Sequence, residues 1–206
     1  MQLEAVNLGF CYRRGAPFVL RQVSFALAQG QRLGLLAPSG YGKTTLAKLL
    51  EGYLAPAEGQ ILLGGAPLPP KGPLAVQLVG QHPEHAVNPR WKMHQVLEEA
   101  GQLQPDVLQG LGIETAWLGR YPAELSGGEL QRFCVARALG PHTRFLIADE
   151  ISTMLDAVTQ AQIWHYLLAQ AGKRGLGLLV ITHSEALAQQ VCSDMLDLQG
   201  LNHAAP

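Results

Sequence analysis

A glycine-rich stretch at residues 37–45, APSGYGKTT, contains residue types that bind a phosphate chain. Gly40 and Gly42 let the backbone turn so that successive N–H groups point at phosphate oxygens, and the following helix adds the positive end of its dipole. Lys43 can reach the terminal phosphates, the Thr44 hydroxyl suits Mg²⁺, and Thr45 can bond near the α-phosphate. An ordinary glycine-rich turn is the alternative. The predicted triphosphate site consists of Ser39, Gly40, Tyr41, Gly42, Lys43, Thr44 and Thr45.

Two acidic residues and a histidine follow compact apolar runs later in the chain. Asp149 and Glu150 end the run that starts at residue 144, and His183 follows the run 178–182. Such runs are typical of strands buried on both faces of a parallel sheet. Because ligands bind at the carboxyl edge of such a sheet, we expect Asp149 to hold Mg²⁺ there. His183 is expected to emerge at the same edge, where it can contact the γ-phosphate. The alternatives are that Asp149 is a solvated acid at a strand end and that His183 is a buried core residue.

The elements that position these groups are of two kinds. The first third of the chain contains short strand patterns punctuated by glycine, which we interpret as an antiparallel sheet. A short amphipathic helix is predicted at 45–50, so that a strand runs through the glycine-rich loop into a helix. The expected strands of this sheet cover residues 3–8, 19–27, 32–36 and 60–63.

The rest of the chain indicates an α/β protein with a parallel core. Runs 144–148 and 178–182 are the expected central strands, and apolar residues at helical spacing between them predict a crossover helix. Residues 88–119 carry helical patches broken by glycine and proline, without a strand pattern, and are interpreted as a helical insertion. Residues 63–73 are rich in glycine and proline and are expected to form a surface loop.

Composition excludes several classes of protein. The chain has 206 residues, of which 48% are hydrophobic and 15% charged, too apolar for a disordered chain. A net charge of −1 argues against a sequence-independent nucleic-acid binder. Three widely spaced cysteines fit a reducing compartment. The beginning of the chain does not match a signal peptide, and no apolar run is long enough for a spanning helix, so we expect a cytosolic location.

Further motifs occur in a fixed order with the phosphate loop: LSGGELQ at 125–131, the acidic strand at 144–150, TMLD at 153–156 and VITH at 180–183. Together they resemble the nucleotide-binding subunit of an ATP-binding cassette (ABC) transporter. The resemblance implies a P-loop NTPase with a RecA-like parallel core, an N-terminal antiparallel β-subdomain and an inserted α-helical subdomain. It implies one ABC ATPase domain over 1–206, with the catalytic core at 1–81 and 141–206 and the helical subdomain at 82–140.

The resemblance also assigns roles to single residues. Glu150 is expected to polarise the attacking water as general base. Gln81 matches the family's Q-loop, where its amide carbonyl contacts Mg²⁺ and the lytic water, so that Thr44, Gln81 and Asp149 are the expected Mg²⁺ ligands. Tyr12 stands where the family stacks adenine on an aromatic ring, although a surface aromatic on an edge strand is the alternative. The implied cofactors are ATP and Mg²⁺.

The signature residues form a second anion site. Ser126, Gly127, Gly128 and Glu129 open a helix, and the resemblance places them over the γ-phosphate of a second cassette in a head-to-tail dimer. Asp156 retains the acidic position of the D-loop. The sequence departs from the family pattern at Ala37, Glu129, Thr153 and Met154, where glycine, glutamine, serine and alanine are usual.

The region around Gln81 resembles the nickel and oligopeptide importer branch, in the stretch QHPEHAVNPR at 81–90. The implied partners are integral-membrane permease subunits, a second cassette that is either a copy or a paralogue, and an extracytoplasmic binding protein, with no nucleic acid. The implied location is peripheral, on the cytoplasmic face of the cell membrane.

A soluble ABC ATPase of translation or DNA repair, or a catalytically weak half of a heterodimer, remains an alternative. We do not expect a metal site among His82, His85 and His94.

Overall fold

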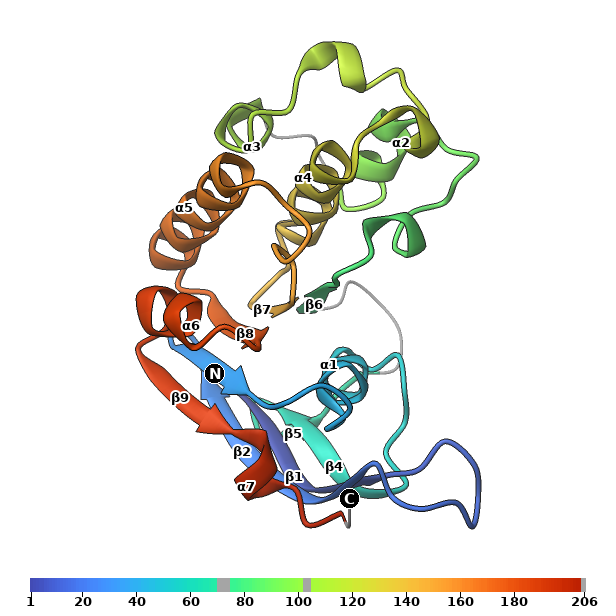
Figure 1. The fold of residues 1–206 in the computed structure, drawn as a ribbon, viewed down its shortest axis with the longest axis vertical. Helices are drawn as coiled ribbons and strands as arrows, with labels where there is room; N and C mark the ends of the chain where they lie inside the picture. Colours follow the sequence, from blue (N-terminus) through green and yellow to red (C-terminus); the bar gives the residue numbers. More distant parts are fainter. Residues whose placement is uncertain (70–74, 102–104, 205–206) are drawn as a thin grey trace.

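A five-stranded parallel sheet forms the centre of the chain (Figure 1), in the order β6-β7-β8-β3-β9. The computed structural model describes residues 1–69, 75–101 and 105–204. Every residue of β7 and β8 is buried, which confirms the two runs that predict central strands. The strands are β3 (Arg32–Leu36), β6 (Val76–Val79), β7 (Phe145–Asp149), β8 (Gly177–Thr182) and β9 (Asp194–Asp197).

A second, antiparallel sheet lies beside the first, in the order β2-β1-β4-β5. Its strands are β1 (Gln2–Phe10), β2 (Leu20–Ala28), β4 (Glu58–Leu63) and β5 (Ala66–Pro67). The assignment of residues 32–36 to this sheet is wrong, because β3 pairs in parallel with β8 and β9. The expected surface loop at 63–73 is also partly wrong, since β5 pairs with β4; residues 70–73 lie outside the described part of the chain.

Alternate side chains of β7 pack into two separate hydrophobic clusters, one on each face of the parallel sheet. Phe145 and Ile147 pack in the cluster between the two sheets, while Leu146 and Ala148 pack in the cluster under the long helices. This alternation follows from the two-residue period of a strand. A strand with large apolar residues on both faces is therefore held at the centre of the sheet, and its carboxyl end is fixed in position.

The helices around the parallel sheet begin and end at recognisable caps. Helix α1 (Lys43–Glu51) starts after Gly42, and its Leu46, Leu49 and Leu50 are fully buried, each contributing about 2 kcal/mol. The crossover helix α5 (Ala157–Arg174) ends at left-handed Gly175. Two short helices complete this part of the fold, α6 (Glu185–Val191) and α7 (Leu198–Leu201).

The segment between β6 and β7 contains helix, turn and loop, with no strand among its described residues 82–101 and 105–140. Figure 1 shows these helices gathered away from the antiparallel sheet. They are η1 (Pro83–His85), α2 (Met93–Glu98), α3 (Pro105–Gly110), η2 (Thr115–Trp117), η3 (Pro122–Glu124) and α4 (Gly127–Ala138). Of the helices in the described ranges, none is both long and apolar enough to cross a lipid bilayer.

Candidate nucleotide-binding site

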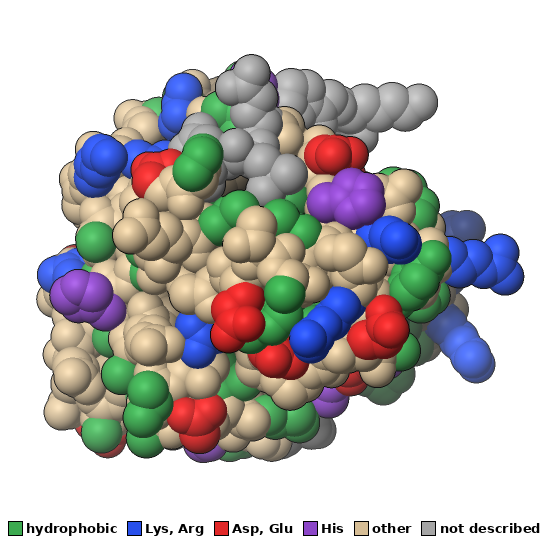
Figure 2. Space-filling model, turned by 90° about the horizontal axis from the view of Figure 1, so that it is seen from above, with side chains coloured by type: hydrophobic (Ala, Val, Ile, Leu, Met, Phe, Trp, Pro, Cys, Tyr) green, Lys and Arg blue, Asp and Glu red, His purple; other side chains and the backbone are tan. Residues whose placement is uncertain are grey.

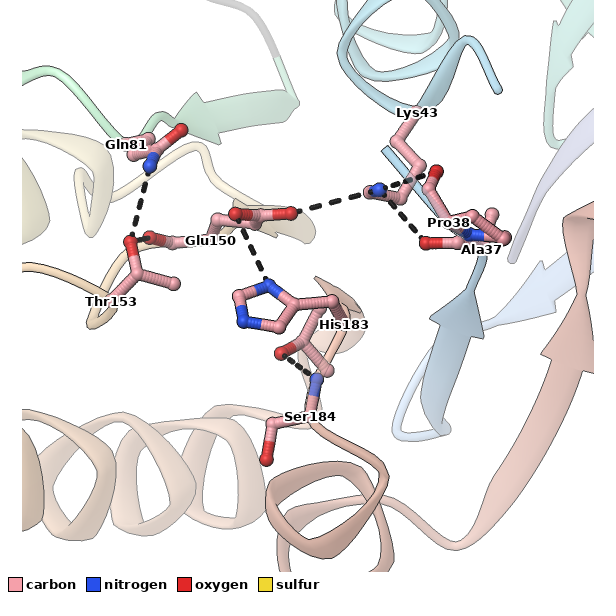
Figure 3. Close-up of polar contacts among 9 residues, drawn as sticks. Ala37, Pro38, Lys43, Gln81, Glu150, Thr153, His183 and Ser184 are labelled. Carbon is pink, nitrogen blue, oxygen red and sulfur yellow. Dashed lines mark hydrogen bonds and ion pairs between the residues drawn. The ribbon is translucent and has the colours of Figure 1, made fainter. Parts of the chain in front are cut away.

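Three neighbouring strands of the parallel sheet deliver the predicted site residues to one edge. The carboxyl end of β3 leads into the phosphate loop, β7 ends in Asp149 and Glu150, and β8 leads to His183. Figure 3 shows the side chains of Lys43, Glu150 and His183 pointing toward one another. The predicted meeting of these groups at the carboxyl edge is therefore present in the structure.

The phosphate loop is bent by two left-handed glycines, Gly40 (φ 86°) and Gly42 (φ 85°). At Gly42 a Cβ atom would lie 2.9 Å from Cδ2 of Leu20, so both the backbone conformation and the space require glycine. Ala37 is buried and is not among the residues with positive φ, so the loop does not need the usual first glycine there.

Lys43 is held inside this loop. Its Nζ donates hydrogen bonds to the carbonyl oxygens of Ala37 and Pro38, each at 2.9 Å. The same ammonium lies 3.7 Å from Oε1 of Glu150, and both side chains are largely buried. Lys43 is thus a fixed, partly desolvated cation at the mouth of the loop, where a phosphate oxygen would meet it.

Glu150 occupies an unusual backbone conformation. Its φ of 52° lies in the left-handed region, which costs about 1–2 kcal/mol for a non-glycine residue. The turn is held because the Glu150 N–H donates to Ile181 O at 2.9 Å and the Thr153 hydroxyl donates to Glu150 O at 3.1 Å. The turn directs the carboxylate to Nδ1 of His183, 3.4 Å away. A strained acid paired with a cation and an imidazole is typical of a catalytic position.

Asp149 and Thr44 together offer oxygen ligands for a cation. Asp149 is 4% exposed, and burial raises the pKa of its carboxyl, while the hydrogen bond from the Thr44 hydroxyl opposes this shift. A cation beside a buried carboxylate favours its ionised form. Hydroxyl and carboxylate oxygens are ligands that Mg²⁺ prefers, so these two residues fit that ion.

Gln81 is linked to the acidic turn through Thr153. Its Nε2 donates to the Thr153 hydroxyl at 3.3 Å, and that hydroxyl donates in turn to Glu150 O (Figure 3). The start of the helical segment and the turn that carries Glu150 are therefore connected by one side chain. Sequence reasoning noted Thr153 only as a departure from the family pattern and missed this contact, for which its hydroxyl was the available signal.

Tyr12 lies beside the start of α1. Its hydroxyl shares a 2.8 Å hydrogen bond with the Thr45 hydroxyl, and its ring meets Phe10 edge-on with the centroids 5.0 Å apart. The side chain is 64% exposed, which leaves a ring face accessible for stacking.

The signature residues lie at the start of α4, and Figure 1 shows this helix apart from α1. Ser126 caps the helix: its hydroxyl accepts from the Glu129 N–H at 3.3 Å, and Glu129 Oε2 accepts from the Ser126 N–H at 2.7 Å. That backbone hydrogen bond lowers the pKa of Glu129. Among the described residues, no hydrogen bond or ion pair joins 126–129, which include Gly127 and Gly128, to the phosphate loop.

Asp156 caps α5 by accepting hydrogen bonds from the N–H groups of Val158 and Thr159, each at 3.0 Å. These bonds lower the pKa of its carboxyl. The preceding Met154 is 67% exposed, and Ser152 accepts a hydrogen bond from the indole of Trp164 at 3.1 Å. The D-loop is thus anchored at both ends and presents an apolar side chain outward.

The histidines after Gln81 do not lie in one cluster. His82 Nδ1 is 3.2 Å from Glu84, and its ring centroid lies 5.5 Å from that of His85. His94 Nδ1 lies instead 3.1 Å from Leu118 O. Within the described ranges, no group of three His, Cys, Asp or Glu residues is placed to hold a metal ion.

The loop between a parallel strand and a helix, with a buried lysine facing an acidic pair, defines a P-loop nucleoside triphosphatase. The family model for ABC transporters matches residues 20–153 of the chain. The chain belongs to the ABC transporter family, as an ATP-binding subunit with ATPase activity.

Two bacterial relatives illustrate this membership. The nickel import ATP-binding protein NikE of Escherichia coli K12 is 34% identical, over 91% of this chain and 77% of the relative. A protein of Brucella abortus named for peptide import is also 34% identical, over 86% of this chain and 60% of its own length. The resemblance to the nickel and oligopeptide branch is confirmed.

Solved structures share the fold. A dimeric ATP-binding cassette with bound ADP and phosphate superposes with a TM-score of 0.82 at 20% identity, covering 95% of this chain and 93% of that one. The ATP-binding subunit of another ABC transporter gives 0.83 at 24% identity, covering 96% and 85%. The α/β P-loop fold with an antiparallel sheet is therefore confirmed.

Proposed function

We propose that this chain is one cassette of an importer and that its ATP hydrolysis drives attached permeases between inward-facing and outward-facing states. The meeting of Lys43, Glu150 and His183 at the edge of the parallel sheet carries this proposal. The names of the relatives support import and favour nickel or a peptide as cargo, and a metal chelate is a third proposed cargo.

In the proposed reaction, backbone N–H groups of 39–45 and the Lys43 ammonium hold the triphosphate. Glu150 accepts a proton from the attacking water, and His183 donates to the γ-phosphate. Oxygens of Thr44, Asp149 and Gln81 would hold Mg²⁺, which would supply positive charge against the phosphates. Tyr12 stacks on the adenine.

Two cassettes complete each site in this proposal. Ser126 and the N–H groups of Gly127 and Gly128 of one chain face the γ-phosphate bound by the other. The distance between α4 and α1 in one chain supports this arrangement, because one cassette does not bring its own signature to its own phosphate loop (Figure 1). Asp156 lies in the D-loop of the same proposed interface.

The helical segment 82–140 is proposed as the subdomain that contacts the permease, with 1–81 and 141–206 as the catalytic core. Trp91 is 37% exposed and Tyr121 is 43% exposed, so two aromatic side chains of this segment are available for contact with a permease. The Lys92 ammonium lies 5.8 Å from the Tyr121 ring centroid, and this cation–π contact holds the exposed Tyr121 ring in place. Gln81 begins the segment and connects it to Glu150 through Thr153.

The proposed setting is the cytoplasmic face of the cell membrane, with permease subunits, a second cassette and an extracytoplasmic binding protein. The face in Figure 2 intersperses acidic and basic side chains, without the continuous basic stripe of a nucleic-acid binder. The net charge of −1 over the whole chain favours a transporter subunit over a translation or DNA-repair ATPase.

Co-expression with the chain's permease in membrane vesicles tests the proposal. We expect ATP-dependent uptake of nickel ion, its chelate or a short peptide, with Mg²⁺-dependent phosphate release. Trp91→Ala is expected to lower the stimulation of turnover by the permease and to leave basal turnover unchanged. Turnover that never responds to a permease, combined with binding to nucleic acid, would overturn the proposal.

A further inference from the structure

Three side chains of α4 bond to main-chain carbonyl groups of the segment 80–86. The pairs are Gln131 Nε2 with Gly80 O (3.1 Å), Cys134 Sγ with Pro83 O (3.8 Å) and Arg137 Nη1 with Ala86 O (2.7 Å). The donors are three residues apart along α4, the acceptors are three residues apart along 80–86, and each pair is separated by the same 51 residues. The helix that begins with the signature and the segment that contains Gln81 therefore lie alongside each other in one fixed register.

The groups that hold this register are fixed and stay protonated at neutral pH. Gln131 is 1% exposed. Burial raises the pKa of the Cys134 thiol to about 12, so the thiol keeps its proton and can donate it. The Arg137 guanidinium also pairs with Glu99 at 3.3 Å. The segment 80–86 is consequently expected to move with α4 as one body.

Gln131 is the member of this set nearest to Gln81, and stability does not account for its amide. Among the described residues, its buried Oε1 accepts no hydrogen bond. A buried polar atom without a partner destabilises the folded state. An apolar side chain of the same length would avoid that cost. The amide is retained where it is only half satisfied, which indicates a role for the one bond that it does form.

That bond leads to the turn that carries Glu150. Gly80, which accepts from Gln131, directly precedes Gln81. Gln81 Nε2 donates to the Thr153 hydroxyl at 3.3 Å, and this hydroxyl donates to Glu150 O at 3.1 Å (Figure 3). The path from the signature helix to the acidic turn therefore consists of three hydrogen bonds and one peptide unit.

We propose that Gln131 is a positioning residue for ATP hydrolysis, which transmits the placement of the signature helix to the turn of Glu150. The inference rests on the proposed roles of Glu150 and Gln81. When the signature meets the γ-phosphate held by the partner chain, a displacement of α4 displaces Gln81 as well, and Thr153 follows. Among the described residues, no hydrogen bond joins Gln131 to the phosphate loop, so its loss changes the rate of hydrolysis and not the affinity for ATP.

Gln131→Met on the full chain tests this assignment, because methionine keeps the length of the side chain and removes both amide groups. We expect kcat to fall about tenfold, the value of one hydrogen bond. ATP affinity should stay within about twofold, and Tm within about 3 °C, because the unpartnered oxygen is removed together with the bond. Phosphate release, calorimetry and thermal unfolding measure these three quantities.

Gln31→Met is the matched control. Gln31 also uses its amide in two contacts, since its Oε1 accepts from the Ala28 N–H at 2.9 Å and its Nε2 donates to Asp194 at 3.1 Å. It precedes β3, at the end of that strand remote from the phosphate loop. We expect wild-type kcat in this variant.

A second variant tests the path itself. Thr153→Val removes the hydroxyl that joins Gln81 to Glu150, and we expect kcat about tenfold lower. If both residues act through the same path, the double variant should be no slower than the slower single variant, whereas independent effects would multiply to about 100-fold. Hydrogen exchange without nucleotide gives a readout independent of turnover: amides of 80–82 and 150–153 should exchange faster in Gln131→Met and unchanged in Gln31→Met.

Unchanged kcat in Gln131→Met, or multiplied effects in the double variant, would overturn the inference. A loss of Tm and ATP affinity in parallel with kcat would show a merely structural residue and would overturn it too. Retained turnover in Glu150→Gln would instead overturn the proposed function, so the two failures are distinguishable.

Discussion

The Lys43 ammonium lies 3.7 Å from the Glu150 carboxylate, so the cation that faces the phosphates is paired with the proposed general base. Opposite charges attract strongly at this distance in a largely buried site. A phosphate that binds Lys43 therefore competes with Glu150 for the same ammonium. The strength of ATP binding and the rate of hydrolysis are linked through this one contact.

Glu150→Gln removes the negative charge and the proton acceptor while keeping the side-chain size. We predict that ATP turnover falls by at least about 100-fold, because general base catalysis is lost. ATP affinity should stay the same or increase, since Lys43 no longer has a competing partner. Phosphate release and equilibrium ATP binding measure the two effects. Glu185→Gln, at an exposed position of α6, is the control, and retained turnover in Glu150→Gln would remove Glu150 from the mechanism.

Lys43→Ala removes the fixed cation of the phosphate loop. We predict a loss of ATP affinity of about 10- to 100-fold, the range expected for a charge-assisted hydrogen bond. Lys48→Ala on the same helix is the matched control, because the Lys48 ammonium lies 5.9 Å from the Tyr53 ring centroid rather than in the loop. Calorimetric titration with ATP measures the affinity of each variant. An affinity of Lys43→Ala equal to that of the wild type would contradict the phosphate-loop assignment.

Glu129→Gln tests the unusual acid of the signature. The Ser126 N–H lowers the pKa of Glu129, so its carboxylate stays charged at neutral pH. We predict that the amide keeps the helix cap, removes repulsion of the partner's γ-phosphate, and strengthens ATP-driven dimerisation several-fold. Ser126→Ala loses the hydroxyl part of the cap, which costs about 1 kcal/mol, and should weaken the dimer. Sedimentation velocity at several protein concentrations compares the dimerisation of the two variants with that of the wild type. A weaker dimer in Glu129→Gln would contradict the placement of this carboxylate near the partner's γ-phosphate.

Glu51→Gln should stabilise the fold at neutral pH. Burial raises the pKa of Glu51, although its carboxylate accepts a 3.3 Å hydrogen bond from the Leu78 N–H. A raised carboxyl pKa favours the folded state below the ordinary pKa, and this contribution is lost as pH rises through the folded value. We therefore predict a Tm higher by about 1–4 °C at pH 7 and a smaller difference near pH 4. An equal gain at both pH values would contradict the burial effect.

Local patterns predicted the parts of the fold that local residues determine. The apolar runs of β7 and β8 are buried on both faces, and the glycines at 40 and 42 adopt the left-handed turns that their spacing indicates. The sheet to which residues 32–36 belong was not predictable, because an apolar run does not encode its partner strand. Only the packing of β3 between β8 and β9 decides it.

In the site, too, residues at strand ends could be predicted from local patterns, whereas contacts between residues distant in the sequence could not. The positions of Asp149, Glu150 and His183 were predictable because Asp149 ends a strand and the other two directly follow one. The bond from Gln81 to Thr153 joins residues 72 apart in sequence, and the bond from Gln199 to Tyr41 joins residues 158 apart. Such contacts depend on how loops fold over the sheet edge, so no spacing in the chain indicates them. The reason why the phosphate loop accepts alanine at position 37 in place of glycine also became clear only from the backbone, since Ala37 is not among the residues with positive φ.

The central claim is that the ATP site is completed by a second cassette, and the mass of Glu150→Gln in solution tests it most directly. In sedimentation velocity with saturating ATP and Mg²⁺, we predict twice the monomer mass, and a single-chain mass when Ser126→Arg is added to the same variant. A species of single-chain mass at every ATP concentration, with wild-type chains hydrolysing ATP at full rate under the same conditions, would contradict the account.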